Sequence, residues 1–461
     1  MQNFTNLERI DPLKRGSNER KKDYDEIYDI FKNSDASSQA DRCVQCGDPY
    51  CHNKCPLHNY IPQWLRGVAK KDLAQSFKLS NETNPFPEIT GRICPQDRLC
   101  EGDCTLEQDG YGAITIGSIE TYISEKGFQK GMKPEFADKF SDKKVAIVGS
   151  GPAGFSCATY LMRSGINVEM FEKSNKPGGL LTYGIPSFKL EKDVVFRRFD
   201  FLTDAGMKLH LGVEVGKDIE LKELIENFDA VFIGIGAEKS KTANLTNEKA
   251  NGVFLAIEFL KNIQQKNFKE EYDKGFEVEG KNVVVIGGGD TAMDCIRTSL
   301  REGASSVKCL YRRDAINMPG SKKEFKNAKE EGAEFVFNSS PKEVQVNSSG
   351  EVVGIEMLKT VLSQKDDSGR QSVSIVDNSE FRVDADVVIF ALGFDQVNPA
   401  FLSENGIKTN KWGEIEASDK LESSTPFVFT GGDCYRGSDL VVTAAEDGKV
   451  AAREIANKLF S

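Results

Sequence analysis

The sequence predicts an α/β protein in which two nucleotide-binding domains follow a mostly α-helical, cysteine-bearing segment. The run KKVAIVGSGPAG begins at Lys143, and a similar run, KNVVVIGGGDTAMDC, begins at Lys281. In each run a short β-branched strand pattern meets a glycine-rich turn and then a helical pattern, which is typical of Rossmann-like domains. Seven of the 11 cysteines lie between Cys43 and Cys104, so we expect this segment to have a function that requires thiols.

Length and charge restrict the class of protein. A chain of 461 residues is long enough for about three domains. Its net charge of −11 provides no basic field that would attract nucleic acid or an anionic membrane. The sequence contains no uncharged apolar run of about 18 residues and no apolar signal-peptide core near its start. We therefore expect a cytoplasmic protein with no nucleic acid and no membrane among its partners.

The first segment is expected to be helical. Apolar residues recur at helical spacing from Tyr60 to Phe77, whereas the proline-rich stretch ETNPFPEITGRICP is expected to be irregular. The residue pattern changes from helical spacing to a β-branched strand pattern at Lys143.

The first glycine-rich turn predicts a dinucleotide site. Gly149 and Gly151 permit a tight turn and the close approach of a pyrophosphate, and Gly154 permits close packing of the following helix. Glu172 ends the next strand pattern, where an acidic residue can accept hydrogen bonds from ribose hydroxyls. An ordinary glycine-rich turn is the alternative.

The second turn carries a different signal. Gly287 and Gly289 repeat the glycine pattern, but the next strand pattern ends in Arg312 and Arg313 instead of an acid. Two guanidiniums suit a 2′-phosphate, because they form bidentate charge-assisted hydrogen bonds with it. NADPH is therefore expected here rather than NADH, and a solvated basic pair is the alternative.

Two dinucleotide sites in one chain imply electron transfer between their ligands, so the first domain is expected to hold FAD. The late motif TGGD places Asp433 where it can meet the ribityl or pyrophosphate region, and a helix starting near Val441 can direct its positive end at reduced flavin. Structural turns are the alternative for these glycines. This arrangement resembles a flavoprotein whose first domain is interrupted by the second and completed by the C-terminus. The expected division of the chain is 1–142, 143–275, 276–395 and 396–461.

The cysteine spacing predicts a metal centre. It reads C-x2-C-x4-C-x3-C followed by C-x5-C-x3-C, with a single C-x2-C pair, so tetrahedral zinc fits less well than iron–sulfur clusters. Seven thiols complete one four-ligand cluster and three corners of another, which leaves an eighth ligand to be found. A zinc knot and free core thiols remain open. His52 and His58 lie within the array and are expected to form hydrogen bonds or be exposed rather than to ligate.

Motifs along the whole chain resemble the small-subunit family of NADPH-dependent glutamate synthases. The similarity extends, more distantly, to the N-terminal half of dihydropyrimidine dehydrogenase and to flavin subunits of electron-bifurcating NADPH:ferredoxin oxidoreductases. The motifs are, in order, RCVQCGDPYCHNKCP, GRICPQDRLCEGDC, ITIGSIE, VAIVGSGPAG, GGLLTYGIP, VIGGGDTAMDC, YRR and TGGD with VVTAAEDGK. The resemblance implies FAD and NADPH domains of the disulfide-reductase-like type, preceded by a mostly helical domain with two [4Fe-4S] clusters.

The resemblance also implies the residues at each site. One cluster takes Cys43, Cys46, Cys51 and Cys104, and the other takes Cys55, Cys94, Cys100 and Glu120, with a surface or helix-capping glutamate as the alternative for Glu120. Lys189 stands where some relatives have arginine. The implied contacts of FAD are Gly149, Gly151, Gly154, Glu172, Leu180, Lys189, Val215, Asp433 and Val441, and those of NADPH are Gly287, Gly289, Asp290, Thr291, Arg312 and Arg313.

The function implied by the resemblance is electron input to glutamate synthesis. NADPH is oxidised at FAD, and electrons pass through the two clusters to a large subunit that makes L-glutamate from L-glutamine and 2-oxoglutarate. No catalytic acid or base is expected, because hydride transfer to flavin needs orientation and electrostatics rather than proton transfer. An NADPH:ferredoxin or sulfide/polysulfide oxidoreductase subunit is the alternative enzyme, and a zinc-holding scaffold is the alternative outside enzymes.

Overall fold

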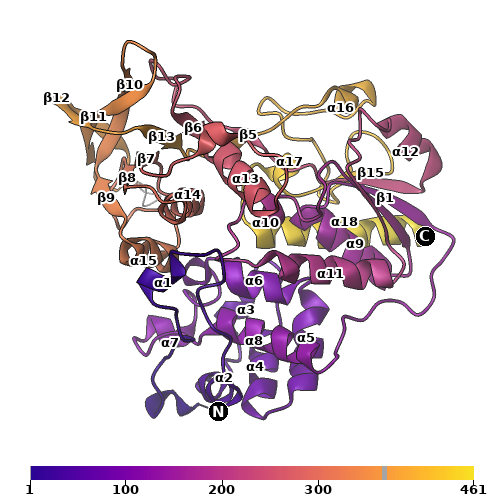
Figure 1. Ribbon diagram of the computed structural model, residues 1–461. Coiled ribbons are helices and arrows are strands. Elements are labelled where there is room, and N and C mark those ends of the chain that lie inside the picture. Colours follow the sequence, from indigo (N-terminus) through magenta and orange to yellow (C-terminus); the bar gives the residue numbers. More distant parts are fainter. Residues whose placement is uncertain (1, 366–370) are drawn as a thin grey trace.

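The computed structural model describes residues 2–365 and 371–461. Two α/β units lie side by side above a helical unit formed by the N-terminal part of the chain (Figure 1). The predicted fold class is confirmed, since each α/β unit contains a five-stranded parallel sheet and the N-terminal unit contains helices but no paired strands among its described residues.

The helical unit packs around the buried side chains of Trp64, Leu65 and Ile119. The proline-rich stretch that the sequence predicts to be irregular contains a helix instead. Pro87 occupies its first turn, where the missing N–H removes no hydrogen bond. The elements are η1 (Asn3–Thr5), α1 (Ser17–Arg20), α2 (Asn33–Asp41), α3 (Tyr50–Lys54), α4 (Ile61–Ala69), α5 (Leu73–Thr83), α6 (Pro87–Ile93), η2 (Gln96–Arg98), α7 (Thr105–Gln108) and α8 (Ile116–Gln129).

The first α/β unit has the parallel strand order β15-β4-β1-β2-β3. Its last strand, β15, comes from the C-terminal part of the chain and pairs with β4, so the end of the chain completes the sheet begun at Lys144. The elements are β1 (Lys144–Val148), α9 (Pro152–Arg163), β2 (Asn167–Glu172), α10 (Leu180–Tyr183), α11 (Lys192–Asp204), β3 (Lys208–Leu211), α12 (Leu221–Asn227), β4 (Ala230–Ile233), α16 (Ala400–Glu404), β15 (Val428–Thr430), α17 (Asp433–Arg436) and α18 (Val441–Phe460).

The second α/β unit has the parallel order β6-β13-β7-β8-β9 and carries an antiparallel sheet of order β10-β11-β12. The elements are β6 (Val253–Leu255), α13 (Ala256–Asn267), η3 (Lys274–Phe276), β7 (Asn282–Ile286), α14 (Asp290–Arg301), β8 (Ser306–Tyr311), α15 (Lys322–Glu331), β9 (Glu334–Phe337), β10 (Ser339–Val346), β11 (Val352–Leu362), β12 (Val373–Val383) and β13 (Val387–Phe390).

Two short strands mark where the chain passes between the α/β units. Strands β5 (Lys239–Ser240) and β14 (Phe394–Asp395) pair antiparallel. Strand β6 already belongs to the second sheet, so the crossing comes before residue 253, earlier than the expected boundary at 275/276. The three-residue strand β6 is too short to stand out as a strand in the sequence. The return at β14 lies beside the expected boundary at 395/396.

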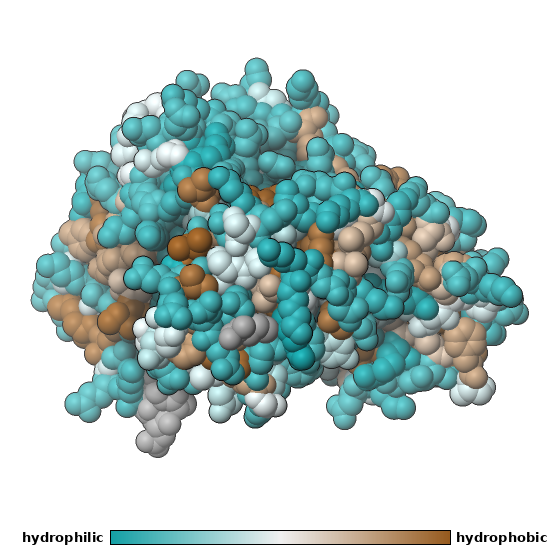
Figure 2. Space-filling view, turned by 90° about the horizontal axis from the view of Figure 1, so that it is seen from below, coloured by the Kyte–Doolittle hydropathy of each residue, from teal (hydrophilic) through white to brown (hydrophobic). Residues whose placement is uncertain are grey.

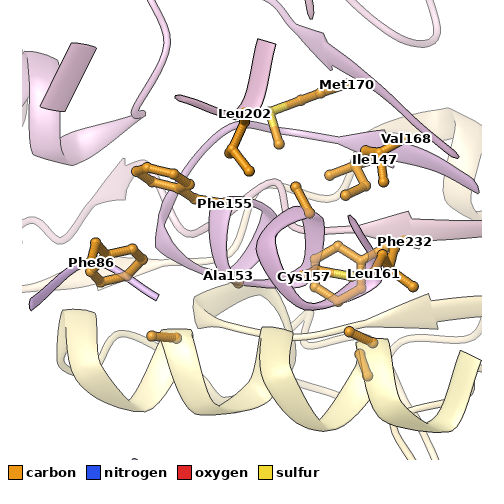
Figure 3. Packing of buried hydrophobic residues seen from close by; sticks show 14 of the residues in the cluster. Phe86, Ile147, Ala153, Phe155, Cys157, Leu161, Val168, Met170, Leu202 and Phe232 are labelled. Carbon is orange, nitrogen blue, oxygen red and sulfur yellow. The ribbon is translucent and has the colours of Figure 1, made fainter. Parts of the chain in front are cut away.

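Helix α18 packs along α9 of the first unit (Figure 3). The same core reaches the helical unit, because the ring of Phe86 lies 5.1 Å from the ring of Phe155, measured between centroids. The first α/β unit and the helical unit therefore share one packed interface.

The molecular surface on the side of the N-terminal helices is largely hydrophilic, with apolar residues in separate groups (Figure 2). Among the described residues, no helix combines the length and the apolar character that crossing a membrane requires.

Candidate functional site

The first glycine-rich turn has the shape of a dinucleotide cradle. A Cβ at Gly149, whose φ is +95°, would lie 2.5 Å from the carbonyl oxygen of Gly234, and one at Gly154 would lie 2.1 Å from that of Gly149. A Cβ at Gly151 would meet nothing within 4 Å. Packing therefore requires the outer two glycines, while the middle one leaves open space at the start of α9, where a pyrophosphate can approach the helix amides.

Glu172 is held against this turn. Its buried carboxylate accepts hydrogen bonds from the Ser150 backbone N at 3.0 Å, from the Ser150 hydroxyl at 2.5 Å and from the Ser174 backbone N at 2.8 Å. The acid therefore lies beside the cradle at the end of β2, as the spacing predicts. Leu180 begins α10. It lies close to the turn, because a Cβ on the preceding residue, Gly179, would be 3.1 Å from the Cα of Gly151.

The C-terminal segment closes this unit at the same end. A Cβ at Gly432 would lie 2.9 Å from that of Ala153, so the turn that leads into α17 packs directly on α9. Asp433 begins α17, and burial raises its pKa to about 7. Val441 begins α18, and Val215 is buried in the core beside β1 and β4.

Lys189, an expected FAD contact, forms an ion pair with the second α/β unit. Its Nζ lies 2.7 Å from Oδ1 of Asp294 on α14 of the second unit. The two side chains are 11% and 8% exposed, and a buried carboxylate needs such a partner. Asp294 and the nearby Glu324 raise the pKa of Lys189. Its contact with FAD stays a prediction.

The second turn repeats the geometry of the first. A Cβ at Gly287, whose φ is +147°, would lie 2.3 Å from the carbonyl oxygen of Ala391, and one at Gly289 would meet nothing within 4 Å. Asp290 and Thr291 begin α14, and Asp290 Oδ1 accepts a hydrogen bond from the Ser321 backbone N at 2.9 Å. Here Gly289, like Gly151 in the first turn, leaves room for a pyrophosphate.

Arg312 and Arg313 follow β8, at the carboxyl end of the second sheet. Arg312 is exposed, and its carbonyl accepts a hydrogen bond from the Thr360 hydroxyl at 2.8 Å. The Nε of Arg313 is buried and has no hydrogen-bond partner among the described residues. A buried N–H without a partner is costly, and an anionic phosphate would satisfy it.

The seven clustered thiols form two neighbourhoods. Cys43 and Cys51 each lie within electrostatic range of Cys46 and Cys104, and Cys51 also lies within range of Cys43. Cys94 and Cys100 interact with Cys55, and all three interact with Glu120. These memberships match the ligand sets that the resemblance implies.

These thiols are unpaired and largely desolvated. No cysteine in residues 2–365 or 371–461 forms a disulfide, and within those residues no group of three or more Cys, His, Asp or Glu side chains is arranged so that it could hold a metal ion as it stands. Burial raises the pKa of Cys51 to about 12 and that of Cys55 to about 11. Ligation requires thiolates, so a cationic iron centre would be the group that stabilises them.

Glu120 lies in the interior of α8 and is 6% exposed, which excludes a surface or helix-capping role. Its Oε1 accepts hydrogen bonds from Asn59 Nδ2 at 2.6 Å and Asn84 Nδ2 at 3.1 Å, and its Oε2 accepts one from Thr90 Oγ1 at 3.1 Å. Burial raises its pKa to about 7. No local pattern in the sequence marks these three polar partners.

The two histidines of the array have the expected roles in the structure. Nδ1 of His52 lies 3.0 Å from the carbonyl oxygen of Asn59, and the His52 and His58 rings lie 5.5 Å apart, measured between centroids. His52 therefore helps to fix the segment that carries Asn59.

Two families match consecutive parts of the chain. Residues 20–132 match the family described as dihydropyrimidine dehydrogenase domain II, 4Fe-4S cluster, and residues 143–448 match pyridine nucleotide-disulphide oxidoreductase. Among solved structures, FprA of Mycobacterium tuberculosis in complex with NADPH is similar, with a TM-score of 0.58 and 19% identity, covering 69% of this chain and 85% of FprA. Thioredoxin reductase of T. acidophilum gives a TM-score of 0.50 and 21% identity, covering 69% of this chain and all of that one. These likenesses show the fold.

Curated relatives match nearly the whole chain. The glutamate synthase [NADPH] small chain of Escherichia coli K12 is 48% identical, covering 99% of this chain and 98% of the relative. The corresponding chain of Azospirillum brasilense is 42% identical, covering 96% and 93%. The putative oxidoreductase AegA of E. coli K12 is 47% identical, covering 97% of this chain and 69% of AegA. The chain belongs to the family of glutamate synthase [NADPH] small chains.

Proposed function

We propose that the chain is the electron-input subunit of an NADPH-dependent glutamate synthase. It binds FAD at the first glycine-rich turn and NADPH at the second, and it carries two [4Fe-4S] clusters in the helical unit. The observation that carries this proposal is the grouping of seven thiols and Glu120 beside two intact dinucleotide cradles. Family membership supports the same assignment.

The protein residues orient the two dinucleotides. Gly151 and Gly289 leave space for the pyrophosphates at the starts of α9 and α14, whose amides donate hydrogen bonds to them. Glu172 accepts hydrogen bonds from the ribose of FAD, and the two arginines after β8 hold the 2′-phosphate of NADPH. Bound flavin supplies a two-electron acceptor that can release single electrons, and iron–sulfur clusters carry single electrons.

The arrangement of the thiols supports an order for the electron path. Cys94 packs against the hydrophobic core of the first α/β unit and Cys55 packs against both that core and the helical one, whereas Cys51, Cys104 and also Cys100 pack against the core of the helical unit. The set with Glu120 is therefore the nearer one to FAD. Cys46, of the other set, lines a surface hollow together with Gln45, Gly47, Pro49, Pro62, Gln63 and Arg66. We infer that electrons leave toward the large subunit from this side.

The deciding experiment is anaerobic purification of the tagged chain from its own host. We expect about eight iron atoms and one FAD per chain, NADPH oxidation with an artificial acceptor, and a large co-purifying subunit. Without an artificial acceptor, the complex should oxidise NADPH only when glutamine and 2-oxoglutarate are both present. Glutamate synthesis by the isolated chain, or zinc in place of iron, would contradict the proposal. Location in the cytoplasm stays a prediction from the sequence.

The similarity to AegA, a putative oxidoreductase, supports a second candidate, an oxidoreductase subunit outside glutamate synthase. Under this alternative, which includes ferredoxin and sulfide or polysulfide oxidoreductases, the iron and flavin contents would be the same. A co-purifying flavoprotein or ferredoxin, without glutamine-dependent NADPH oxidation, would favour it.

A further inference from the structure

Arg98 joins the helical unit to the second glycine-rich turn. It ends η2, the single turn between Cys94 and Cys100, and its Nη2 lies 3.2 Å from Oδ2 of Asp290, the first residue of α14. The two residues are 192 positions apart in the chain. A side chain of the cysteine-bearing unit therefore reaches the start of the helix at which we place the NADPH pyrophosphate.

A second contact at the same place shows that Asp97 of the η2 turn, as well as Arg98, touches the second α/β unit. Oδ2 of Asp97 accepts a hydrogen bond from the backbone N of Lys322 at 3.3 Å. Ser321, the preceding residue, donates its backbone N–H to the other oxygen of Asp290. The η2 turn, the glycine-rich turn and the start of α15 thus meet at one point.

The η2 turn is held by several hydrogen bonds and by close packing. The carbonyl of Gln96 accepts hydrogen bonds from the backbone N of Glu101 at 2.9 Å and of Gly102 at 3.0 Å. A Cβ at Gly102 would lie 2.2 Å from the carbonyl oxygen of Asp97, so this chain reversal is tightly packed. The Gln96 side chain also donates to the carbonyl of Gly91 at 3.1 Å. The backbone that carries Arg98 is therefore held in position.

The charges explain why an arginine is useful here. Asp290 puts a negative charge at the start of α14, where it would oppose the binding of a pyrophosphate to the helix amides. The Arg98 side chain is 42% exposed, and its guanidinium carries five N–H donors, of which the contact with Asp290 uses one nitrogen. Open space lies beside Asp290 at Gly289.

We propose that Arg98 is an NADPH-binding residue supplied by the helical unit. Asp290 holds its guanidinium at the edge of the cradle, and the guanidinium donates hydrogen bonds to the pyrophosphate of NADPH. The inference rests on the proposed function, because it takes the second turn as the NADPH site. It means that the loop between Cys94 and Cys100 completes that site.

The test compares Arg98→Gln and Arg98→Lys with Arg382→Gln. Arg382, on β12, is a suitable control, because its side chain is 52% exposed and also pairs with an aspartate, Asp384. NADP⁺ binding is measured by calorimetry on the full chain, and NADPH oxidation is measured with ferricyanide. Arg98→Gln should weaken NADP⁺ binding about tenfold and raise the KM for NADPH equally, with kcat nearly unchanged. Arg98→Lys should lie between, and Arg382→Gln should match the wild type.

Three results would overturn the inference. The first is wild-type affinity in Arg98→Gln while the wild-type chain binds NADP⁺ and oxidises NADPH, which leaves the proposed function intact. The second is restored affinity in the double variant Arg98→Gln/Asp290→Asn, because Arg98 would then only neutralise Asp290. The third is a wild-type chain that neither binds NADP⁺ nor oxidises NADPH, which would overturn the proposed function as well. Iron and FAD contents identify a variant that has lost its fold, and Arg98→Lys then provides the comparison.

Discussion

Arg198 on α11 donates a hydrogen bond from Nε to Oε1 of Glu88 on α6 at 2.6 Å, and the two side chains are 1% and 0% exposed. Nη1 of Arg198 also donates to Oδ1 of Asn81 at 3.0 Å. Helix α11 belongs to the first α/β unit and α6 to the helical unit, and they lie directly against each other (Figure 1). A buried ion pair thus joins the unit expected to hold flavin to the unit expected to hold the clusters.

Breaking this pair should destabilise the protein strongly. Arg198→Met leaves Glu88 as a buried charge without its cation, so we expect a loss of about 3–5 kcal/mol in the free energy of unfolding. The double variant Arg198→Met/Glu88→Met should recover much of that loss, because it leaves no charge unpaired. Denaturant unfolding measures both, and Arg382→Met on the surface is the control. Equal stability of the single variant and the control would contradict this expectation.

Glu120 should be required for one cluster and not for the other. Glu120→Ala removes the oxygen ligand that the resemblance implies for its cluster, so we expect about half the iron of the wild-type chain. Glu120→Gln keeps a ligating oxygen but removes a negative charge, so it should retain iron and raise the reduction potential of that cluster. Iron analysis and redox titration followed by electron paramagnetic resonance provide the measurements. Glu135→Ala, at a side chain that is 79% exposed, is the control. Full iron content in Glu120→Ala would exclude the ligand role.

The pair Arg312 and Arg313 should determine the choice of nicotinamide cofactor. Replacing both by serine removes charge-assisted hydrogen bonds worth about 1.5–3 kcal/mol each, so kcat/KM for NADPH should fall at least tenfold. The value for NADH should change little, because NADH lacks the 2′-phosphate. Steady-state kinetics with both cofactors tests this, with Arg382→Ser as the control. An equal loss of kcat/KM for NADPH and NADH would show that the arginines do not bind the 2′-phosphate.

The glycine-rich turns and the residues after their strands could be predicted from the sequence, because these motifs are local. Gly151 and Gly154 have their roles within a single strand–turn–helix unit, since a Cβ at Gly154 would meet Gly149 itself, and the φ of +95° at Gly149 belongs to the same turn. Arg98 and Asn59 could not be predicted in this way, since tertiary packing alone brings them to Asp290 and Glu120. Glu120 as the eighth ligand is a prediction from the family resemblance, and its burial is consistent with that assignment.

The ion pair of Lys189 and the strand β6 also depend on tertiary packing, so the sequence did not show them. The resemblance places Lys189 at the flavin, but packing of α14 against its loop supplies a buried carboxylate, and the ammonium pairs with that group. The three residues of β6 form a strand only because β13 lies beside them, so no local pattern marks the first domain crossing.

Lys192 should make stability depend on pH in the alkaline range. Its buried Nζ donates hydrogen bonds to the carbonyls of Leu181 at 2.9 Å and Ile185 at 2.5 Å, and burial lowers its pKa to about 7. The unfolded chain, with a lysine pKa of about 10.4, binds more protons than the folded chain between these two values. Stability should therefore rise as pH increases from about 7 to about 10. In Lys192→Met this rise should be smaller than in the wild type, whereas Lys78→Met, at an exposed ammonium, should keep it. Unfolding by denaturant at several pH values measures the difference, and parallel profiles for the wild type and Lys192→Met would show that Lys192 keeps its proton in the folded protein.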